Sequence, residues 1–183
     1  FNMGLDYSYE DIEEKEIISE ETVFSGSNYI DTGIKLLETD TSWTLAIDYS
    51  WDSGNSNNST LMQCYQGDGS NGFRLWYSSE PKASWGTSSI SAAAVSKRDV
   101  LVLRHVKGET KLHVYKGNLP ELDVDYTELT ASRATAATST LVLGCARADD
   151  GVYENYAKGT VYWCKLWYED LGNDACEQLA LWT

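Results

Sequence analysis

Residues 43–51, WTLAIDYSW, carry the pattern that decides the fold. Large apolar side chains occupy every second position, and Asp48 is the only charged residue of the stretch. This alternation is typical of a β-strand with one buried face. Two more β-type runs, 100–106 (VLVLRHV) and 111–115 (KLHVY), enclose the glycine-containing segment 107–110 (KGET), and together they predict a β-hairpin.

The remainder of the chain extends this pattern towards the C-terminus. Residues 141–145 and 161–168 predict two further strands, the second of them apolar on both faces. The segments that connect the strands are rich in small, polar, turn-forming residues. One helix is predicted after Gly172, with Asn173 as its N-cap. Many short strands and one small helix predict an all-β sandwich.

The first 21 residues differ from the remainder in charge. The run 10–21 (EDIEEKEIISEE) is dense in carboxylates that repel one another, so we expect residues 1–21 to form an acidic lead-in or linker. The opening FNMG is typical of a fragment cut from a larger protein. A chain of 183 residues has the length of one domain with a full core, which we assign to residues 22–183.

Net charge and cysteine spacing exclude several classes of partner. Fourteen basic against 28 acidic residues give a net charge of −14. Nucleic acids and anionic membranes are bound by clustered Lys and Arg, so we expect no nucleic-acid partner and no membrane partner. The four cysteines include no C-x-x-C pair, which argues against zinc. Buried, reduced thiols from folding in a reducing cytoplasm are favoured over a disulfide.

The aromatic composition favours Trp and Tyr strongly over Phe. The chain has seven Trp and twelve Tyr but only three Phe. Trp and Tyr each combine an apolar ring with a polar group, so they suit half-wet surfaces, including sugar-binding ones. Packing between two sheets is the alternative use of such broad, flat side chains.

Five segments carry a recognisable order of motifs: 23–33 (VFSGSNYIDTG), 42–47 (SWTLAI), 102–117 (ending LHVYKG), 141–144 (LVLG) and 158–161 (KGTV). In this order they resemble the strands of laminin-G-like domains in the concanavalin A-like jelly-roll superfamily. The resemblance covers the chain from about residue 22 to its end. It implies a two-sheet antiparallel jelly-roll sandwich with one short C-terminal helix.

The C-terminal stretch carries a narrower resemblance. Residues 159–182 (GTVYWCKLWYEDLGNDACEQLALW) are similar to laminin-G-like modules embedded in structural or tail proteins of bacteriophages. This resemblance implies a place on the virion surface after assembly in the host cytoplasm, which agrees with reduced cysteines. A secreted or cell-surface bacterial protein is the alternative.

The sequence does not bring catalytic groups together. Glycoside hydrolases of this superfamily place two carboxylates on one strand, about 5–5.5 Å apart in retaining enzymes. Here the carboxylate cluster 10–16 lies in the lead-in, and the strand 43–51 carries Asp48 alone. We therefore predict no catalytic residue and no enzymatic activity, with a glycoside hydrolase as the less favoured alternative.

Two histidines lie on neighbouring strands of the predicted hairpin and would be close enough to approach each other. A metal site or a pH switch could use His105 and His113 together. No third ligand type is spaced to join them, so ordinary exposed positions on the hairpin are the favoured interpretation.

The loop before the last strand has the side chains that sugar binding needs. Residues 147–156 (RADDGVYENY) mix carboxylates, an amide and two tyrosines. Sugars stack their C–H faces on aromatic rings, while planar polar groups bind their hydroxyls. Three aromatic residues of the middle strands could line a sheet face, with core or rim packing as the alternative. The candidate ligand-binding residues are Trp76, Tyr77, Trp85, Asp150, Tyr153, Asn155 and Tyr156.

No cofactor is required for binding of this kind, but calcium is a candidate ion. Asp68 and the pair Asp149 and Asp150 would supply the hard oxygen ligands that calcium prefers. Ordinary turn residues are the alternative, because Asp is common in turns for local reasons.

These features predict a non-catalytic carbohydrate- or receptor-binding module of a phage virion protein. The expected partner is a glycan or a host cell-surface receptor. The alternative is a structural or assembly module that packs against other virion subunits through its aromatic surface.

Overall fold

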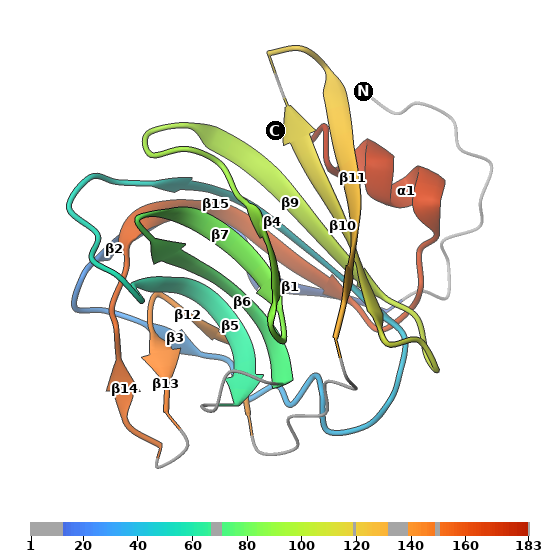
Figure 1. Ribbon diagram of the computed structural model, residues 1–183, viewed down its shortest axis with the longest axis horizontal. Coiled ribbons are helices and arrows are strands. Elements are labelled where there is room, and N and C mark those ends of the chain that lie inside the picture. The colour runs from blue at the N-terminus through green and yellow to red at the C-terminus, as the bar shows by residue number, and fades with distance from the viewer. Residues whose placement is uncertain (1–12, 67–70, 119, 132–138, 149–150, 183) are drawn as a thin grey trace.

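The computed structural model describes residues 13–66, 71–118, 120–131, 139–148 and 151–182. Two antiparallel sheets pack face to face, and one short helix lies against the outside of one sheet (Figure 1). The predicted all-β sandwich of two antiparallel sheets with one short C-terminal helix is therefore confirmed.

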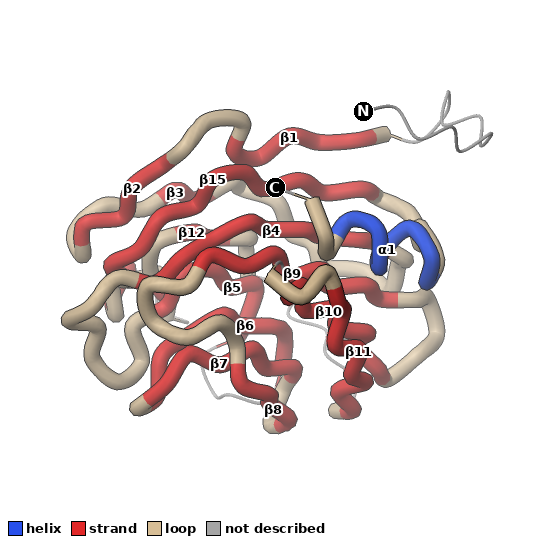
Figure 2. Tube along the Cα trace, turned by 90° about the horizontal axis from the view of Figure 1, so that it is seen from above, coloured by secondary structure: helices blue, strands red, loops and turns tan. Residues whose placement is uncertain are grey.

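The first sheet has seven strands within the described residues and follows the order β1–β15–β4–β9–β10–β11, with β2 also paired to β15. Its strands are β1 (Glu14–Ile18), β2 (Thr22–Ser25), β4 (Trp43–Trp51), β9 (Arg98–His105), β10 (Lys111–Asn118), β11 (Asp123–Thr130) and β15 (Lys158–Trp167). Strands β9 and β10 pair antiparallel, which confirms the predicted hairpin. Figure 2 shows β1 at the outer edge of this sheet.

The second sheet has six strands within the described residues, in the order β3–β12–β5–β6–β7–β8. Its strands are β3 (Ile30–Asp31), β5 (Thr60–Gln66), β6 (Asn71–Ser78), β7 (Glu80–Trp85), β8 (Ser88–Ser91) and β12 (Val142–Leu143). A small hairpin of β13 (Ala146–Arg147) and β14 (Tyr153–Glu154) projects beside β3 and β12 (Figure 1). The helix α1 (Asn173–Leu179) follows β15.

Part of the acidic lead-in belongs to the sandwich. Strand β1 pairs with β15, and Lys165 Nζ lies 2.7 Å from Glu14 Oε1 across the pair. Ile18, at the end of β1, is buried in the core. Residues 1–12 lie outside the described residues, so the division of the chain at residue 21 stays a prediction.

All nine residues of β4 are buried, although the sequence pattern predicted one buried face. The large apolar side chains point into the core between the sheets, as predicted. The opposite face is covered as well: Ala46 packs in a second apolar cluster with α1. Asp48 accepts hydrogen bonds from Arg98, and Ser50 Oγ lies 3.3 Å from the hydroxyl of Tyr162. Neighbouring strands and the helix bury the second face of β4. The alternation within β4 contains no information about these covering groups, so it predicts only one buried face.

The helix covers one end of the seven-stranded sheet and begins differently from the prediction. Gly172, with a φ of 80°, occupies the N-cap position, and no side chain caps the helix. Asn173 instead accepts a hydrogen bond from the hydroxyl of Tyr115 and donates one to Glu177. Cys176 and Leu179 face the sheet and are buried.

All four cysteines are buried free thiols, as predicted. Burial raises the pKa of the Cys64 and Cys145 thiols to about 12. Thiols with so high a pKa stay protonated at neutral pH, so they behave as small apolar core residues.

Gly117 sets how closely the end of α1 approaches strand β10. A Cβ atom at this position would collide with the backbone carbonyl of Ala180. We expect Gly117→Ala to push the helix off the sheet and to lower the free energy of unfolding by about 2 kcal/mol. Urea unfolding measures this loss, and a midpoint equal to that of the parent protein would contradict the close approach.

Candidate functional site

The outer face of the six-stranded sheet carries polar and aromatic side chains that the core does not use. Along β6 the side chains of Phe73 and Leu75 are buried in the core, and Tyr77 packs against it. Because neighbouring side chains on a strand point to opposite faces, Arg74 and Trp76 lie on the outer face.

Arg74 is held on this face by aromatic rings and neutral oxygen atoms. Its Cζ lies 4.6 Å from the ring centroid of Trp76 and 5.7 Å from that of Tyr65. Its Nε donates to Thr60 Oγ1 at 3.0 Å, and its Nη2 donates to the carbonyl oxygen of Asn58 at 2.9 Å. The guanidinium group is therefore fixed in place before any ligand arrives.

No carboxylate forms an ion pair with Arg74 in the part of the chain that the structure describes. Burial lowers the pKa of Arg74 from its ordinary value, and Tyr65 and the more distant Glu154 oppose that shift. The guanidinium still carries its charge, because arginine keeps its proton in proteins. Among the described residues, a half-buried positive charge thus lacks a contact anion, in a chain that has twice as many acidic as basic residues.

Three tyrosines, which we call the tyrosine cluster, flank the same face: Tyr29, Tyr153 and Tyr156. The rings of Tyr29 and Tyr153 stack with centroids 4.2 Å apart, and Tyr156 lies at 6.1 Å from Tyr29 in a tilted arrangement. The hydroxyl of Tyr153 donates to Asp31 Oδ2 at 2.6 Å. Arg147 lies beside the cluster, with its Cζ 5.9 Å from the ring centroid of Tyr153.

The cluster adjoins Arg74 through strand β5. Gln63 Nε2 donates to the carbonyl oxygen of Arg147 at 3.1 Å, which ties the β13–β14 hairpin to the sheet. The backbone N–H of Thr60 donates to the carbonyl oxygen of Asn155 at 2.8 Å. Because Thr60 also accepts the bond from Arg74, a single residue connects the cluster to the guanidinium group.

Two buried N–H donors on this part of the molecule have no acceptor among the described residues. They are Nε1 of Trp76 and Nε of Arg147. Unpaired buried donors are rare in folded proteins.

The structure places the predicted aromatic residues of the middle strands on different faces. Trp76 lies on the outer face, against Arg74. Tyr77 points inward, with its ring centroid 6.1 Å from that of Trp51. Trp85 is only 1% exposed and donates from Nε1 to the carbonyl oxygen of Thr110, so its place as a ligand-binding residue is corrected to core packing. The reason is its pairing with Phe73 across β6 and β7, which turns both side chains inward.

The predicted loop residues fall into three groups. Tyr153 and Tyr156 belong to the tyrosine cluster, and their role in binding stays a prediction. Asn155 has a φ of 54°, a left-handed conformation that Asn tolerates better than most residues, and its backbone carbonyl holds Thr60. Asp150 lies outside the described residues.

The predicted calcium ligands Asp68, Asp149 and Asp150 all lie outside the described residues, so calcium stays a prediction. Within the described ranges, no group of three or more His, Cys, Asp or Glu side chains could hold a metal ion. In the same ranges, no helix is long and apolar enough to cross a membrane.

The two histidines differ from the expectation of exposed positions that approach each other. Both residues are buried, at 6% exposed. His105 Nε2 lies 3.1 Å from Asp40 Oδ1, and His113 Nε2 lies 2.6 Å from Glu109 Oε2. His113 pairs with Arg104, the neighbour of His105, so alternation directs the two histidines to opposite faces of the sheet.

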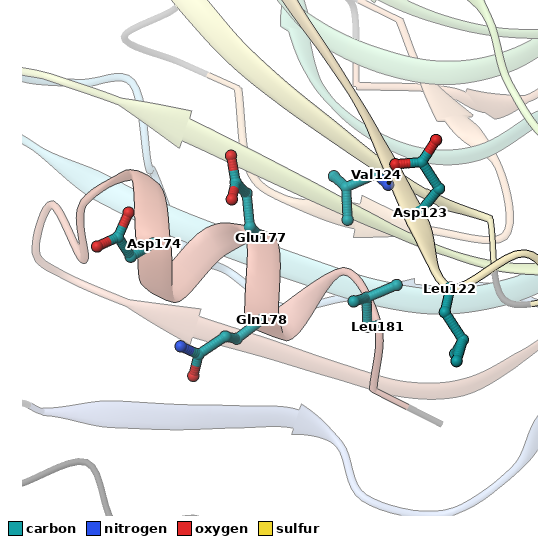
Figure 3. Close-up of a pocket in the computed structure, with 7 residues that line it drawn as sticks. All are labelled: Leu122, Asp123, Val124, Asp174, Glu177, Gln178 and Leu181. Carbon is teal, nitrogen blue, oxygen red and sulfur yellow. Dashed lines mark hydrogen bonds between the residues drawn. The ribbon is translucent and has the colours of Figure 1, made fainter.

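A hollow lies between α1 and the start of β11 and has a volume of about 550 Å³ (Figure 3). Its lining includes the carboxylates of Asp123, Asp174 and Glu177 and no aromatic side chain. Carboxylates repel anions, and sugars bind best where aromatic rings are present. The outer face of the six-stranded sheet is therefore the better candidate for a glycan site.

Sequence reasoning missed Arg74, Tyr65, Arg147 and Tyr29. The signal for Arg74 was available, because the alternating set Phe73, Leu75 and Tyr77 leaves Arg74 and Trp76 on the other face. Tyr29 had no such signal, since its partners lie far along the chain.

Asp31 fixes the tyrosine cluster, and its ionisation links that contact to pH. Burial alone would raise the pKa of the Asp31 carboxyl, but hydrogen bonds from the Tyr153 hydroxyl and the Gly33 backbone N–H outweigh burial and lower it. A lowered pKa in the folded state means that the carboxylate stabilises the fold above the pKa of the unfolded chain, about pH 4, and that this contribution disappears as the pH falls through the folded value.

We expect Asp31→Asn to lower the free energy of unfolding by about 1 kcal/mol at pH 7, because a charge-assisted hydrogen bond is lost. The difference between the two proteins should shrink at pH 3, which lies below the pKa of the carboxyl in the unfolded chain. Urea unfolding at both pH values measures the two differences. An equal difference at both would contradict the role of the ionised carboxylate.

No protein-family model matches the sequence, and no curated protein matches it. Solved structures do share its fold. The leech intramolecular trans-sialidase, solved in complex with 2,7-anhydro-Neu5Ac, superposes with a TM-score of 0.63 at 13% identity over 94% of this chain. The CBM40 domain of Ruminococcus gnavus IT-sialidase, bound to alpha2,3 sialyllactose, superposes with a TM-score of 0.61 at 14% identity over 91% of this chain.

The NanB sialidase of Streptococcus pneumoniae gives a TM-score of 0.61 at 14% identity over 87% of this chain. The chain spans 28% of the leech enzyme and 27% of NanB, but 97% of the Ruminococcus gnavus domain. It therefore has the β-sandwich fold of a single domain of this size.

Proposed function

We propose that this domain is a non-catalytic carbohydrate-binding module that holds an acidic glycan on the outer face of its six-stranded sheet. The observation that carries the proposal is Arg74, a half-buried guanidinium group between aromatic rings with no ion-pair partner among the described residues. A carboxylate on a sugar would supply the missing anion.

The chemistry of Arg74 suits a sugar acid. Thr60, Asn58 and Tyr65 supply three acceptors to its guanidinium group, which has five N–H donors. The remaining donors present the planar geometry that binds carboxylates at two points. The ring of Trp76 offers an apolar surface beside them for the C–H face of the sugar. The bound sialyllactose of the Ruminococcus gnavus domain, whose fold this chain shares, supports the same ligand class.

Two of the carboxylates, Asp31 at the tyrosine cluster and Asp48 on the other sheet, do not suit glycosidase chemistry. A glycosidase needs a general acid whose pKa is raised so that it keeps its proton at neutral pH. The pKa of Asp31 is lowered instead. Asp48 is buried on the opposite sheet beneath Arg98. These two carboxylates support a binding role over hydrolysis.

The parent protein in this proposal is a phage structural or tail protein, on the resemblance of residues 159–182, with the module at the virion surface and a host glycan as its receptor. Calcium is not required for a site built on Arg74, so binding should persist in a chelator.

Titration calorimetry with alpha2,3-sialyllactose, with lactose as the uncharged control, tests the proposal. We expect a dissociation constant of about 1 mM or tighter for the acidic sugar, equivalent to about 4 kcal/mol, and much weaker binding of lactose. The contradicting test uses sialylated, uronic-acid and sulfated glycans at concentrations on the order of 10 mM, well above the expected dissociation constant. Absence of binding to all of them would refute the proposal and favour the assembly alternative.

A further inference from the structure

We propose that the tyrosine cluster is a second sugar subsite. The sugar unit that follows the acidic sugar on Arg74 would stack on the tyrosine rings. The module would then recognise at least a disaccharide. This inference rests on the proposed function. It adds the minimum length of the glycan and the residues that bind its second sugar unit.

The cluster has no structural task in either core. Tyr29, Tyr153 and Tyr156 belong to neither of the two buried apolar clusters of the described residues. Tyr29 is 40% exposed, and only one of its faces stacks on Tyr153. An aromatic stack that fills no core and remains open on one side is typical of a surface that receives a flat, partly apolar ligand.

The cluster is fixed before a ligand binds. The hydroxyl of Tyr153 is anchored to Asp31 at 2.6 Å, and Asp31 also accepts the backbone N–H of Gly33 at 3.0 Å. Arg147 pairs with Tyr153 across the β13–β14 hairpin. Side chains already held in place lose little conformational entropy on binding, so their contacts contribute more fully to affinity.

The position of the cluster matches a ligand that extends from Arg74. Tyr156 forms an isolated β-bridge with Thr60, and Thr60 pairs with Trp76 on the other side. Two strand spacings therefore separate the residues that carry the two aromatic groups, on the order of 10 Å. A disaccharide has about this length, so its acidic unit can lie on Arg74 and Trp76 while its second unit reaches Tyr156. The ring of Tyr29 lies 6.1 Å from that of Tyr156, so a third sugar unit would reach it.

The chemistry of the cluster favours an uncharged second unit. Arg147 is the cation nearest to it, and the charge of Arg147 acts on Asp31, whose pKa it helps to lower. The cluster thus presents aromatic rings beside the carboxylate of Asp31, which would repel a second carboxylate. C–H surfaces of a neutral hexose suit such rings better than a second carboxylate does.

The experiment compares a monosaccharide with its extended form. Calorimetry would measure the methyl glycoside of sialic acid and alpha2,3-sialyllactose against the parent protein and Tyr29→Ala. We expect the parent to bind the trisaccharide about tenfold more tightly, as one stacking contact predicts. Tyr29→Ala should remove this preference and leave monosaccharide binding within about twofold of the parent, because Arg74 remains intact.

Two control variants separate binding from folding. Tyr29→Phe keeps the ring and should keep the preference. Tyr168→Ala removes a similarly exposed tyrosine, 42% exposed, that directly follows β15 of the other sheet, and should change neither affinity. Binding of both ligands with equal affinity by the parent, or an unchanged preference in Tyr29→Ala, would overturn the subsite while leaving the proposed function intact. Absence of binding to both ligands would overturn both.

Discussion

We expect Arg74→Ala to weaken the binding of alpha2,3-sialyllactose by roughly a hundredfold, equivalent to about 3 kcal/mol. Removing the guanidinium group leaves the carboxylate of the sugar without its charged partner on a face where Trp76 and Tyr65 limit access of water. Titration calorimetry measures the loss. The fold should persist, because the hydrogen-bond partners of Arg74 among the described residues are neutral groups.

Two further variants identify the reason for the loss. Arg74→Lys keeps the charge but lacks the planar group, so we expect it to recover only part of the affinity. Lys35→Gln removes one exposed positive charge elsewhere and should bind as the parent does. If Arg74→Ala and Lys35→Gln had equal effects, general electrostatic attraction would replace a defined carboxylate site.

The largest effect on stability is expected at the ion pair on the outside of the seven-stranded sheet. Asp48 is fully buried and, among the described residues, its side chain is hydrogen-bonded by Arg98, whose Nη2 lies 2.6 Å from Oδ2 and whose Nε lies 2.9 Å from Oδ1. Arg98 also covers the ring of Tyr162 at 3.7 Å. We expect Arg98→Ala to lower the free energy of unfolding by about 3 kcal/mol, because a buried carboxylate loses its counter-charge.

The double variant Arg98→Ala with Asp48→Asn tests this explanation by urea unfolding. Removing the unpaired buried charge of Asp48 should recover part of the lost stability, although Asn remains a buried polar group. Lys165→Ala serves as the control, since its partner Glu14 is exposed and such pairs contribute about 1 kcal/mol or less. A double variant no more stable than Arg98→Ala would assign the loss to the packing of Arg98 on Tyr162 instead.

Sequence patterns predicted the secondary structure better than the site. The hairpin of β9 and β10 and the long strand β15 were visible because alternation and turn residues are local properties. The same alternation could have placed Arg74 on the outer face. The prediction instead selected aromatic residues and so included Trp85 as a ligand-binding residue. Only the pairing of Trp85 with Phe73 across two strands shows that its ring points inward.

The sequence by itself determined an all-β sandwich, its hairpin and its reduced cysteines, because side-chain period and composition are encoded in neighbouring residues. The tertiary structure alone decided that both faces of β4 are buried, since the covering groups come from Arg98, Tyr162 and α1. It also decided the candidate site, by stacking Tyr29 on Tyr153 and by placing Thr60 between Tyr156 and Arg74. These contacts join segments far apart in the chain, and no local pattern records which distant partner a side chain will meet.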